Sequence, residues 1–289
     1  MTSTQSIKSM LVAAAAQLKI EGAAFEAQLL MQHALGVNRA WLIAHDNDVL
    51  PANVQSTFQT LLKRRASGEP MAYIFGYREF YGLKLKVTPD TLIPRPDTET
   101  LVEAALAKIP PLAPLTEGES DKCRVLDLGT GSGAIALSLA QHRPQAEVIA
   151  VDTSPAALVV AKQNAQNLKI ANVRFVLSDW FSALAGEQFD VIVSNPPYIE
   201  QQDMHLQQGD LRFEPLSALA SGQDGLDDIR RIVAAAALHL QPQGWLLLEH
   251  GYNQAQSVAD LLQQAGFVEI DHAQDLAGIL RVTMGRLEP

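Results

Sequence analysis

The feature that most constrains this chain's fold is a regular alternation, from Arg124 onward, of short apolar runs with helix-patterned segments. The apolar runs are residues 125–128, 148–151, 173–177, 190–194 and 245–248, and the helix-patterned segments are 134–141, 155–168, 227–240 and 254–265. Strands and helices that alternate at this spacing form parallel sheets joined by right-handed crossovers. The sequence therefore predicts an α/β fold with a mostly parallel sheet, ending in strands at 268–271 and 279–284.

The residues before this alternation are patterned as helices. Apolar side chains recur at helical spacing within residues 7–18, 27–35 and 54–62, which predicts a small all-helical N-terminal bundle. Aromatic residues among glycines, followed by the period-two run at 83–87, predict a β-hairpin-like connector. The expected domains are a helical bundle at 1–67, a connector at 68–96 and an α/β domain at 97–289, with a loop at 110–120.

Composition disfavours several kinds of partner and site. The chain has 22 Lys and Arg against 32 Asp and Glu, and the net charge of -10 disfavours a broad contact with nucleic-acid phosphates. Cys123 is the single cysteine, so an internal disulfide is excluded and a cytoplasmic location is expected. No apolar run reaches membrane-spanning length, and residues 1–10 lack a signal-peptide pattern. The histidines show no metal-ligand spacing, so no metal is expected.

Polar residues follow four of the predicted strands at the point where each strand ends. Asp127 precedes a glycine-rich loop, Asp152 and Asp179 end the next two strands, and Asn195 ends the fourth. Ligands of open α/β sheets bind outside the carboxyl ends of the strands, so these residues are expected to form one site. Asp179 and the following Trp180 either place a carboxylate and an aromatic face where an adenine could lie or are an ordinary turn Asp and a core Trp, and both interpretations predict that Trp180 is buried.

The glycine-rich loop, residues 129–133, follows a strand and opens a helix. Its glycines allow a ligand to approach the backbone at a helix N-terminus. Gly129, Gly131 and Ala134 also satisfy a dinucleotide fingerprint, and Asp152 lies where a ribose-binding carboxylate belongs. The loop alone leaves open which nucleotide-like ligand it binds, and a tight turn without a ligand is the plain alternative.

Asn195, Pro196, Pro197 and Tyr198 end a β-branched run abruptly. Prolines have fixed φ and no N–H, so their carbonyls remain available as acceptors. Asn195 adds a side-chain acceptor and Tyr198 a flat face. Together these residues could hold one planar NH2 group, and a simple proline turn is the alternative interpretation.

With these motifs the chain resembles class I S-adenosylmethionine-dependent methyltransferases, which have a Rossmann-like fold. The Asn-Pro-Pro-Tyr ending resembles that of the subset that methylates planar amide or exocyclic amine nitrogens. Four further segments are similar to segments of the glutamine methyltransferases of peptide chain release factors: Gly68–Ile74, Ile93–Glu99, Arg212–Pro215 and Gly222–Leu226. The resemblance covers nearly the whole chain.

The resemblance implies an enzyme that methylates the glutamine amide in the Gly-Gly-Gln motif of release factors, docked by the helical bundle. Asn195 and the Pro196 carbonyl would accept the two amide hydrogens, with Tyr198 packed beside the amide, so these three are the implied catalytic residues. Pro197 joins them in binding the substrate. The implied S-adenosylmethionine site consists of Gly129, Thr130, Gly131, Ser132, Gly133, Asp152, Asp179, Trp180 and Asn195.

Three other functions remain open at this point. A DNA or RNA base amine also presents an NH2 beside a flat ring, although the negative charge disfavours such a substrate. A non-catalytic partner protein would bind a nucleotide on the glycine loop and use Asn195 only to end a strand. A dehydrogenase would bind a dinucleotide on the same loop.

Overall fold

The computed structural model describes residues 5–109 and 122–288. The chain divides into two compact units, Met1–Gly76 and Tyr77–Pro289, each with its own apolar core. The loop predicted at 110–120 lies outside the described residues.

The first unit is helical, as its apolar periodicity predicts. Its helices are α1 (Ile7–Leu18), α2 (Ala23–Leu35), α3 (Arg39–Ala44), α4 (Ala52–Ala66) and α5 (Met71–Phe75). Ile7, Leu30 and Phe58 are fully buried at the centre of its core. The sequence pattern did not predict α3 and α5, because helices of six and five residues are too short to show a periodicity.

The predicted domain boundaries differ from the observed ones. The expected connector at 68–96 is divided between the units, since Ile74 of α5 packs in the helical core while Phe80 and Leu83 pack in the core of the second unit. The hairpin itself is present, as β1 (Tyr77–Phe80) paired antiparallel with β2 (Leu83–Lys86). The chain therefore divides between Gly76 and Tyr77, because buried contacts rather than local pattern decide where a domain ends.

The second unit is built on a sheet of seven strands in the order β5-β4-β3-β6-β7-β9-β8. The strands are β3 (Arg124–Leu128), β4 (Glu147–Asp152), β5 (Val173–Leu177), β6 (Phe189–Ser194), β7 (Leu240–Glu249), β8 (Phe267–Gln274) and β9 (Leu280–Leu287). Neighbouring strands from β5 to β7 are parallel, and β9 is antiparallel to both β7 and β8. The mostly parallel α/β sheet predicted from the sequence is confirmed.

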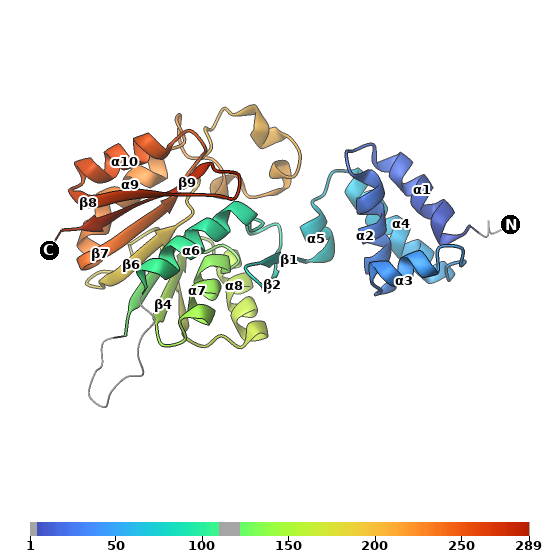
Figure 1. The fold of residues 1–289 in the computed structure, drawn as a ribbon, viewed down its shortest axis with the longest axis horizontal. Helices are drawn as coiled ribbons and strands as arrows, with labels where there is room; N and C mark the ends of the chain where they lie inside the picture. Colours follow the sequence, from blue (N-terminus) through green and yellow to red (C-terminus); the bar gives the residue numbers. More distant parts are fainter. Residues whose placement is uncertain (1–4, 110–121, 289) are drawn as a thin grey trace. The chain divides into compact units, whose positions relative to one another are not determined.

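Helices cover both faces of this sheet (Figure 1). On one face lie α6 (Glu99–Lys108), α7 (Ala134–His142) and α8 (Pro155–Leu168), and on the other lie α9 (Asp227–His239) and α10 (Ala255–Gln264). Successive strand residues point to opposite faces, so Val125 packs with α6 and α7 whereas Leu126 packs with α9 and α10. Burial on both faces explains why the strands read as nearly continuous apolar runs.

Irregular segments join these elements beside the carboxyl ends of the strands. A 3-10 turn, η1 (Pro96–Thr98), leads into α6, and the segment after β6 contains η2 (Met204–Gln207), η3 (Leu211–Phe213) and η4 (Leu216–Ala218). Within this segment Ile199 and Ala220 form an isolated bridge. The segment thus folds back on the residues that directly follow Asn195.

Candidate functional site

A cavity of about 360 Å³ lies at the carboxyl ends of β3, β4, β5 and β6. Its lining includes residues from all four predicted strand ends: Gly129, Gly131, Asp152, Asp179, Trp180, Asn195 and Pro197. The cavity is within the size range of sites for small molecules and cofactors. The parallel sheet therefore brings the predicted constellation together at one edge.

The glycine loop approaches the cavity through its backbone. Gly129 has φ +75°, a backbone conformation that residues with a side chain rarely adopt, and a Cβ there would be in van der Waals contact with the Trp180 ring, 3.5 Å from Cζ3. Gly133 has φ +85°, and a Cβ there would meet Cδ1 of Leu137 at 3.0 Å. Gly129 and Gly131 line the cavity, whereas Thr130, Ser132 and Gly133 are not among its lining residues and serve the turn into α7.

Two carboxylates hold the loop. Asp127 is fully buried, and its Oδ2 accepts from the Thr130 hydroxyl at 2.7 Å and from the Ala136 N–H at 3.1 Å, while its Oδ1 has no partner among the described residues. Burial raises the pKa of Asp127 to about 7. Asp152 accepts from the Gly131 N–H at 2.9 Å and from the Ser154 N–H at 2.8 Å, and burial raises its pKa as well.

Asp152 keeps acceptor capacity after these contacts. Oδ2 accepts from Gly131 and Oδ1 from Ser154, the Thr153 N–H makes a smaller contribution, and a carboxylate offers about four acceptor sites. Asp152 also lines the cavity, so its remaining acceptor capacity could serve the hydroxyl groups of a ribose.

The third strand end differs in part from the sequence prediction. Asp179 is exposed and is held by Arg231 of α9, whose Nη2 lies 2.9 Å from both carboxylate oxygens. Trp180 was expected to be buried, but it is only partly buried, because it packs on the apolar core and also lines the cavity. The Trp180 ring forms a flat wall of the cavity near Gly129. Asp179 also lines the cavity, but its carboxylate is already paired with Arg231.

The fourth strand end holds Asn195 through its amide nitrogen. Nδ2 of Asn195 donates to Oγ1 of Thr98 at 3.1 Å, while Pro196 is buried and Pro197 lines the cavity. The Tyr198 hydroxyl donates to Oε1 of Glu249 at 3.2 Å, and burial raises the pKa of this hydroxyl, so it stays protonated and acts as a donor. Among the described residues, the side-chain carbonyl oxygen of Asn195 has no hydrogen-bond partner, so it is available as an acceptor.

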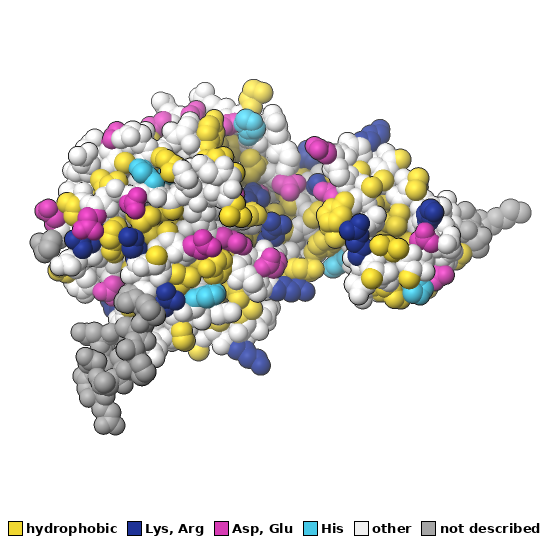
Figure 2. All heavy atoms as spheres, in the orientation of Figure 1, with side chains coloured by type: hydrophobic (Ala, Val, Ile, Leu, Met, Phe, Trp, Pro, Cys, Tyr) yellow, Lys and Arg dark blue, Asp and Glu magenta, His cyan; other side chains and the backbone are white. Residues whose placement is uncertain are grey.

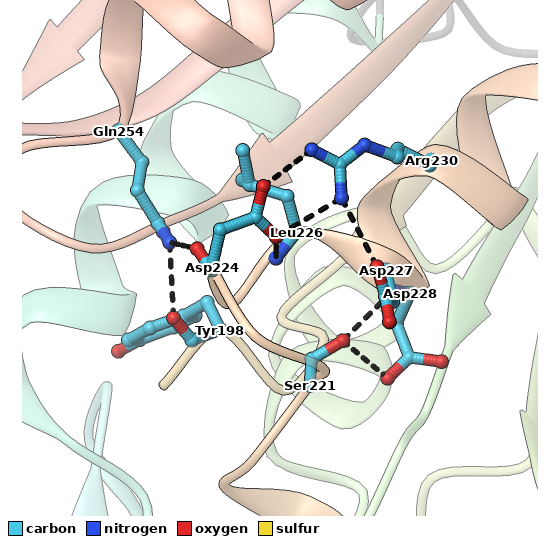
Figure 3. A network of polar contacts seen from close by, with 8 residues as sticks. All are labelled: Tyr198, Ser221, Asp224, Leu226, Asp227, Asp228, Arg230 and Gln254. Atoms are coloured by element: carbon cyan, nitrogen blue, oxygen red, sulfur yellow. Dashed lines mark hydrogen bonds and ion pairs between the residues drawn. The ribbon is translucent and has the colours of Figure 1, made fainter. Parts of the chain in front are cut away.

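The segment 221–228 supports the backbone of Tyr198 (Figure 3). Nε2 of Gln254 donates to the carbonyl of Tyr198 at 3.1 Å and to the carbonyl of Asp224 at 3.2 Å. A Cβ on Gly225 would lie 2.2 Å from the Tyr198 carbonyl oxygen, so only glycine allows this approach. Arg230 and Asp224 form an ion pair at 2.5 Å that holds the same turn.

Two segments quoted for the family resemblance meet beside the site. The buried carboxylate of Glu214 accepts from the Ile93 N–H at 2.9 Å and forms an ion pair with Arg95. Ile93 and Glu214 are 121 positions apart in the sequence. The fold therefore joins these two segments through one buried carboxylate.

Sequence reasoning did not assign Thr98, Arg231 or Glu249 to the site. Thr98 is 3% exposed and Glu249 is 1% exposed, and burial raises the pKa of Glu249 to about 7 against the lowering effect of hydrogen bonds from Thr98 and Tyr198. A signal for Glu249 existed, because it ends β7, the strand next to β6. Thr98 lies within the family-like segment Ile93–Glu99, whereas Arg231 carried no comparable signal, since only the fold brings it to the site.

Sequence comparison identifies the family. The protein-family model described as "Methyltransferase domain" matches residues 119–266, and the family model described as "PrmC N-terminal domain" matches residues 9–76. The release factor glutamine methyltransferase of Salmonella typhimurium is 48% identical over 91% of this chain and 92% of its own length. Those of Xylella fastidiosa and Bordetella pertussis are each 51% identical, over 90% and 91% of this chain and 92% and 94% of their own lengths. The chain belongs to the release factor glutamine methyltransferase family.

Solved structures agree with a methyltransferase fold. A methyltransferase from Pyrococcus furiosus has a TM-score of 0.52 at 16% identity, covering 80% of this chain and 100% of that one. A 16S rRNA methyltransferase of T. thermophilus has a TM-score of 0.52 at 22% identity, covering 73% of this chain and 50% of that one. At these identities the likeness concerns the fold alone. Family membership also sets aside the dehydrogenase interpretation of the glycine loop.

The described residues lack a metal-binding cluster and a membrane-spanning helix. Within residues 5–109 and 122–288, no group of three or more His, Cys, Asp or Glu side chains is arranged to hold a metal ion. In the same part of the chain, no helix combines the length and apolarity needed to cross a membrane.

Proposed function

We propose that this protein transfers the methyl group of S-adenosylmethionine to the side-chain amide nitrogen of the glutamine in the Gly-Gly-Gln motif of release factors. The observation that carries the proposal is that Asn195 lines the same cavity as the glycine loop and Asp152 while its Nδ2 is bonded to Thr98, which leaves Oδ1 as the acceptor that Asn195 can offer to a ligand. One cavity thus combines an acceptor for a planar NH2 with a surface for a nucleoside. The relatives' names supply the identity of the substrate.

The residues present fit S-adenosylmethionine. Gly129 and Gly131 leave room for a ligand along the loop backbone, Asp152 has lone pairs for ribose hydroxyls, and Trp180 offers a flat wall for adenine. The unpartnered, buried Oδ1 of Asp127 lies under the same loop. When bound, S-adenosylmethionine would supply a methyl group on a sulfonium sulfur, which would leave as a neutral thioether, and the methylated amide nitrogen would then lose its proton.

The protein's own contribution is to hold and aim the amide nitrogen. The nitrogen lone pair is delocalised into the carbonyl, so an amide attacks poorly. Asn195 Oδ1 and the Pro196 carbonyl accept its two hydrogens, which favours the positive charge that develops on nitrogen. Positioning can supply about 7 to 11 kcal/mol of barrier reduction. Two neutral hydrogen bonds contribute only about 1 kcal/mol each, so alignment dominates.

A labelling experiment tests this function. Purified protein is incubated with methyl-labelled S-adenosylmethionine and a release factor, and the labelled residue is located by mass spectrometry. We expect one methyl group on the Gly-Gly-Gln glutamine. A folded protein that binds S-adenosylmethionine but leaves this glutamine unlabelled would contradict the proposal.

Substitution of Asn195 tests the assigned role and separates an enzyme from a non-catalytic binding protein. Asn195→Ala is expected to lower kcat by at least about tenfold, because it removes one acceptor and the alignment that the acceptor provides. The Kd for S-adenosylmethionine, measured by calorimetry, is expected to stay within about twofold of wild type. A variant that keeps full turnover would remove Asn195 from the mechanism.

Nucleic acid is the alternative substrate, and charge disfavours it. The net charge is -10, and on the face drawn in Figure 2 Lys and Arg side chains are scattered among acidic ones. Methylation of DNA or RNA with a steep salt dependence, without methylation of release factors, would favour this alternative. A release-factor substrate also places the proposed activity in the cytoplasm, where translation ends.

A further inference from the structure

A buried set of polar side chains runs behind Asn195, away from the cavity. Asn195 Nδ2 donates to Thr98 Oγ1 at 3.1 Å, and the Tyr198 hydroxyl donates to Glu249 Oε1 at 3.2 Å. The Thr98 hydroxyl lowers the pKa of the Glu249 carboxylate, whose Oε2 has no hydrogen-bond partner among the described residues. Thr98 is 3% exposed and Glu249 1% exposed, so water does not compete for these groups. The proposed function does not explain why a carboxylate is buried here.

The fold fixes the members of this set on separate elements. Ser194 is in register with Leu248 in the parallel pair β6 and β7. Asn195 and Glu249, each one residue further along, therefore lie at the same level of the sheet. Thr98 is the last residue of η1, and Arg281 of β9 holds the preceding Asp97 at 3.0 Å. The three side chains are therefore positioned by the sheet and by a short turn tied to it.

Counting protons determines which way the Asn195 amide points. An ionised carboxylate has no proton to donate, so Glu249 only accepts. Thr98 has one hydroxyl proton, and it lowers the pKa of Glu249 only when that proton points at the carboxylate. Thr98 Oγ1 can then only accept from Asn195, which requires the NH2 of Asn195 to face Thr98 and its oxygen to face the cavity.

We propose that Glu249 and Thr98 are positioning residues that orient the amide of Asn195, so that the site accepts a hydrogen-bond donor and rejects an acceptor. The inference rests on the proposed function and deepens it, since it names how the site recognises an NH2. A glutamine amide fits this orientation. A glutamate carboxylate in the same place would face the Asn195 oxygen with no proton to share, so it is excluded.

Protonation of Glu249 is expected to weaken this orientation. A protonated carboxyl can donate to Thr98, which frees the Thr98 proton to point at Asn195 and allows the amide to turn over. The charged groups that face Glu249 are Asp97, which raises its pKa, and Arg281, which lowers it, with Tyr198 and Thr98 as hydrogen-bond partners. Because the pKa of Glu249 is about 7, kcat should fall as the pH decreases through this value.

The test compares Glu249→Gln, Thr98→Val and Thr98→Ser with the wild type. We expect Glu249→Gln and Thr98→Val to lower kcat by about tenfold or more with the Kd for S-adenosylmethionine unchanged, and Thr98→Ser to retain activity within about threefold. Glu249→Gln should also lose the acidic limb attributable to Glu249. Any acidic limb that remains is assigned to Asp127, whose pKa is also about 7.

Thr283→Val is the matched control, because Thr283 is a fully buried threonine in β9 that bonds to His250 and His272 outside the site. It is expected to keep wild-type kcat and pH profile. Wild-type turnover and an unchanged acidic limb in Glu249→Gln would overturn the inference, as would equal losses in Thr98→Ser and Thr98→Val. If Glu249→Gln does not fold, the two Thr98 variants decide. A wild type that does not methylate release factors would instead overturn the proposed function.

Discussion

At the scale of single residues, the site combines ionisable groups whose environments oppose their charge. Asp127 and Glu249 are buried carboxyls, and burial raises the pKa of each to about 7. Each is retained in spite of that cost because it accepts hydrogen bonds that orient other groups, the glycine loop in one case and Thr98 and Tyr198 in the other. Keeping these two buried carboxyl groups therefore lowers the free energy of unfolding near neutral pH, where ionising them is costly.

This cost predicts a pH dependence of stability. The pKa of Glu249 is raised in the folded state from an ordinary value of 4.5, so between pH 5 and 6.5 the folded state binds more protons than the unfolded state. The free energy of unfolding should therefore fall as the pH rises, by up to about 1.4 kcal/mol per pH unit from this one group.

Comparison of wild type with Glu249→Gln isolates that contribution. The lowered pKa of buried His250 gives a slope of opposite sign, and it is present in both proteins. Chemical unfolding at pH 5 and 6.5 should show that the variant gains stability relative to wild type at the higher pH. Equal slopes in the two proteins would show that Glu249 is already ionised at pH 5.

Binding of the ribose gives a second prediction at this scale. Asp152→Asn keeps the shape of the side chain and removes the charge that strengthens its bonds to hydroxyls. The Kd for S-adenosylmethionine is expected to rise by about tenfold or more, while KM for the release factor at saturating cofactor stays close to wild type. Because Gly131 also bonds to Asp152, circular dichroism and thermal unfolding should accompany the titration. An unchanged Kd would remove Asp152 from the cofactor site.

At the scale of elements, the turn at 221–228 supports the residues that follow β6. Gln254, at the start of α10, bridges the carbonyls of Tyr198 and Asp224, and Gly225 allows the two segments to approach (Figure 3). Gly225 is needed for packing against the Tyr198 backbone, whereas Gly222 leaves room for the side chain of Asp227, so both glycines serve the backbone of this turn.

Gly225→Ala tests this support. A Cβ at Gly225 would lie 2.2 Å from the Tyr198 carbonyl oxygen, so the Tyr198 backbone must move and kcat should fall along with stability. Gly186→Ala is the matched control, since Gly186 has a similar φ of +77° and a Cβ there would have nothing within 4 Å. We expect Gly225→Ala to lose about 1 to 3 kcal/mol more than Gly186→Ala, measured by urea unfolding. Equal losses would show that the contact is easily relieved.

At the scale of the whole molecule, we propose that the two compact units have different roles, with the reaction site in one and substrate docking in the other. The residues of the cavity all belong to the second unit, and the first unit has its own buried core. We propose that the helical unit docks the release factor. Exposed apolar side chains on it, Val12, Phe25 and Ile43 among them, offer surface for such a partner.

Removal of residues 1–76 tests the docking role. The shortened protein is expected to show a rise of about tenfold or more in KM for the release factor, because it loses binding surface but keeps the cavity. The Kd for S-adenosylmethionine, measured on the same preparation, serves as the control for folding and is expected to be unchanged. A collapse of cofactor binding would instead assign the helical unit a structural role.

Much of this organisation follows from the sequence by itself. The strand runs, the glycine loop and the polar strand ends are local patterns, and a parallel sheet brings the carboxyl ends of its strands to one edge for any such sequence. Asp152, Trp180 and Asn195 could therefore be assigned to one site in advance, and the helical character of the first unit followed from its apolar period.

Only the tertiary structure decided the rest. Asn195 meets Thr98 across a sequence separation of 97, and Tyr198 meets Glu249 across 51, and contacts of this kind leave no periodicity to detect. The pairing of Asp179 with Arg231, the partial exposure of Trp180 and the division of the chain at Gly76 are likewise results of packing in three dimensions. Local patterns specify elements and their ends, whereas the buried polar partners that orient a functional side chain depend on which elements come together.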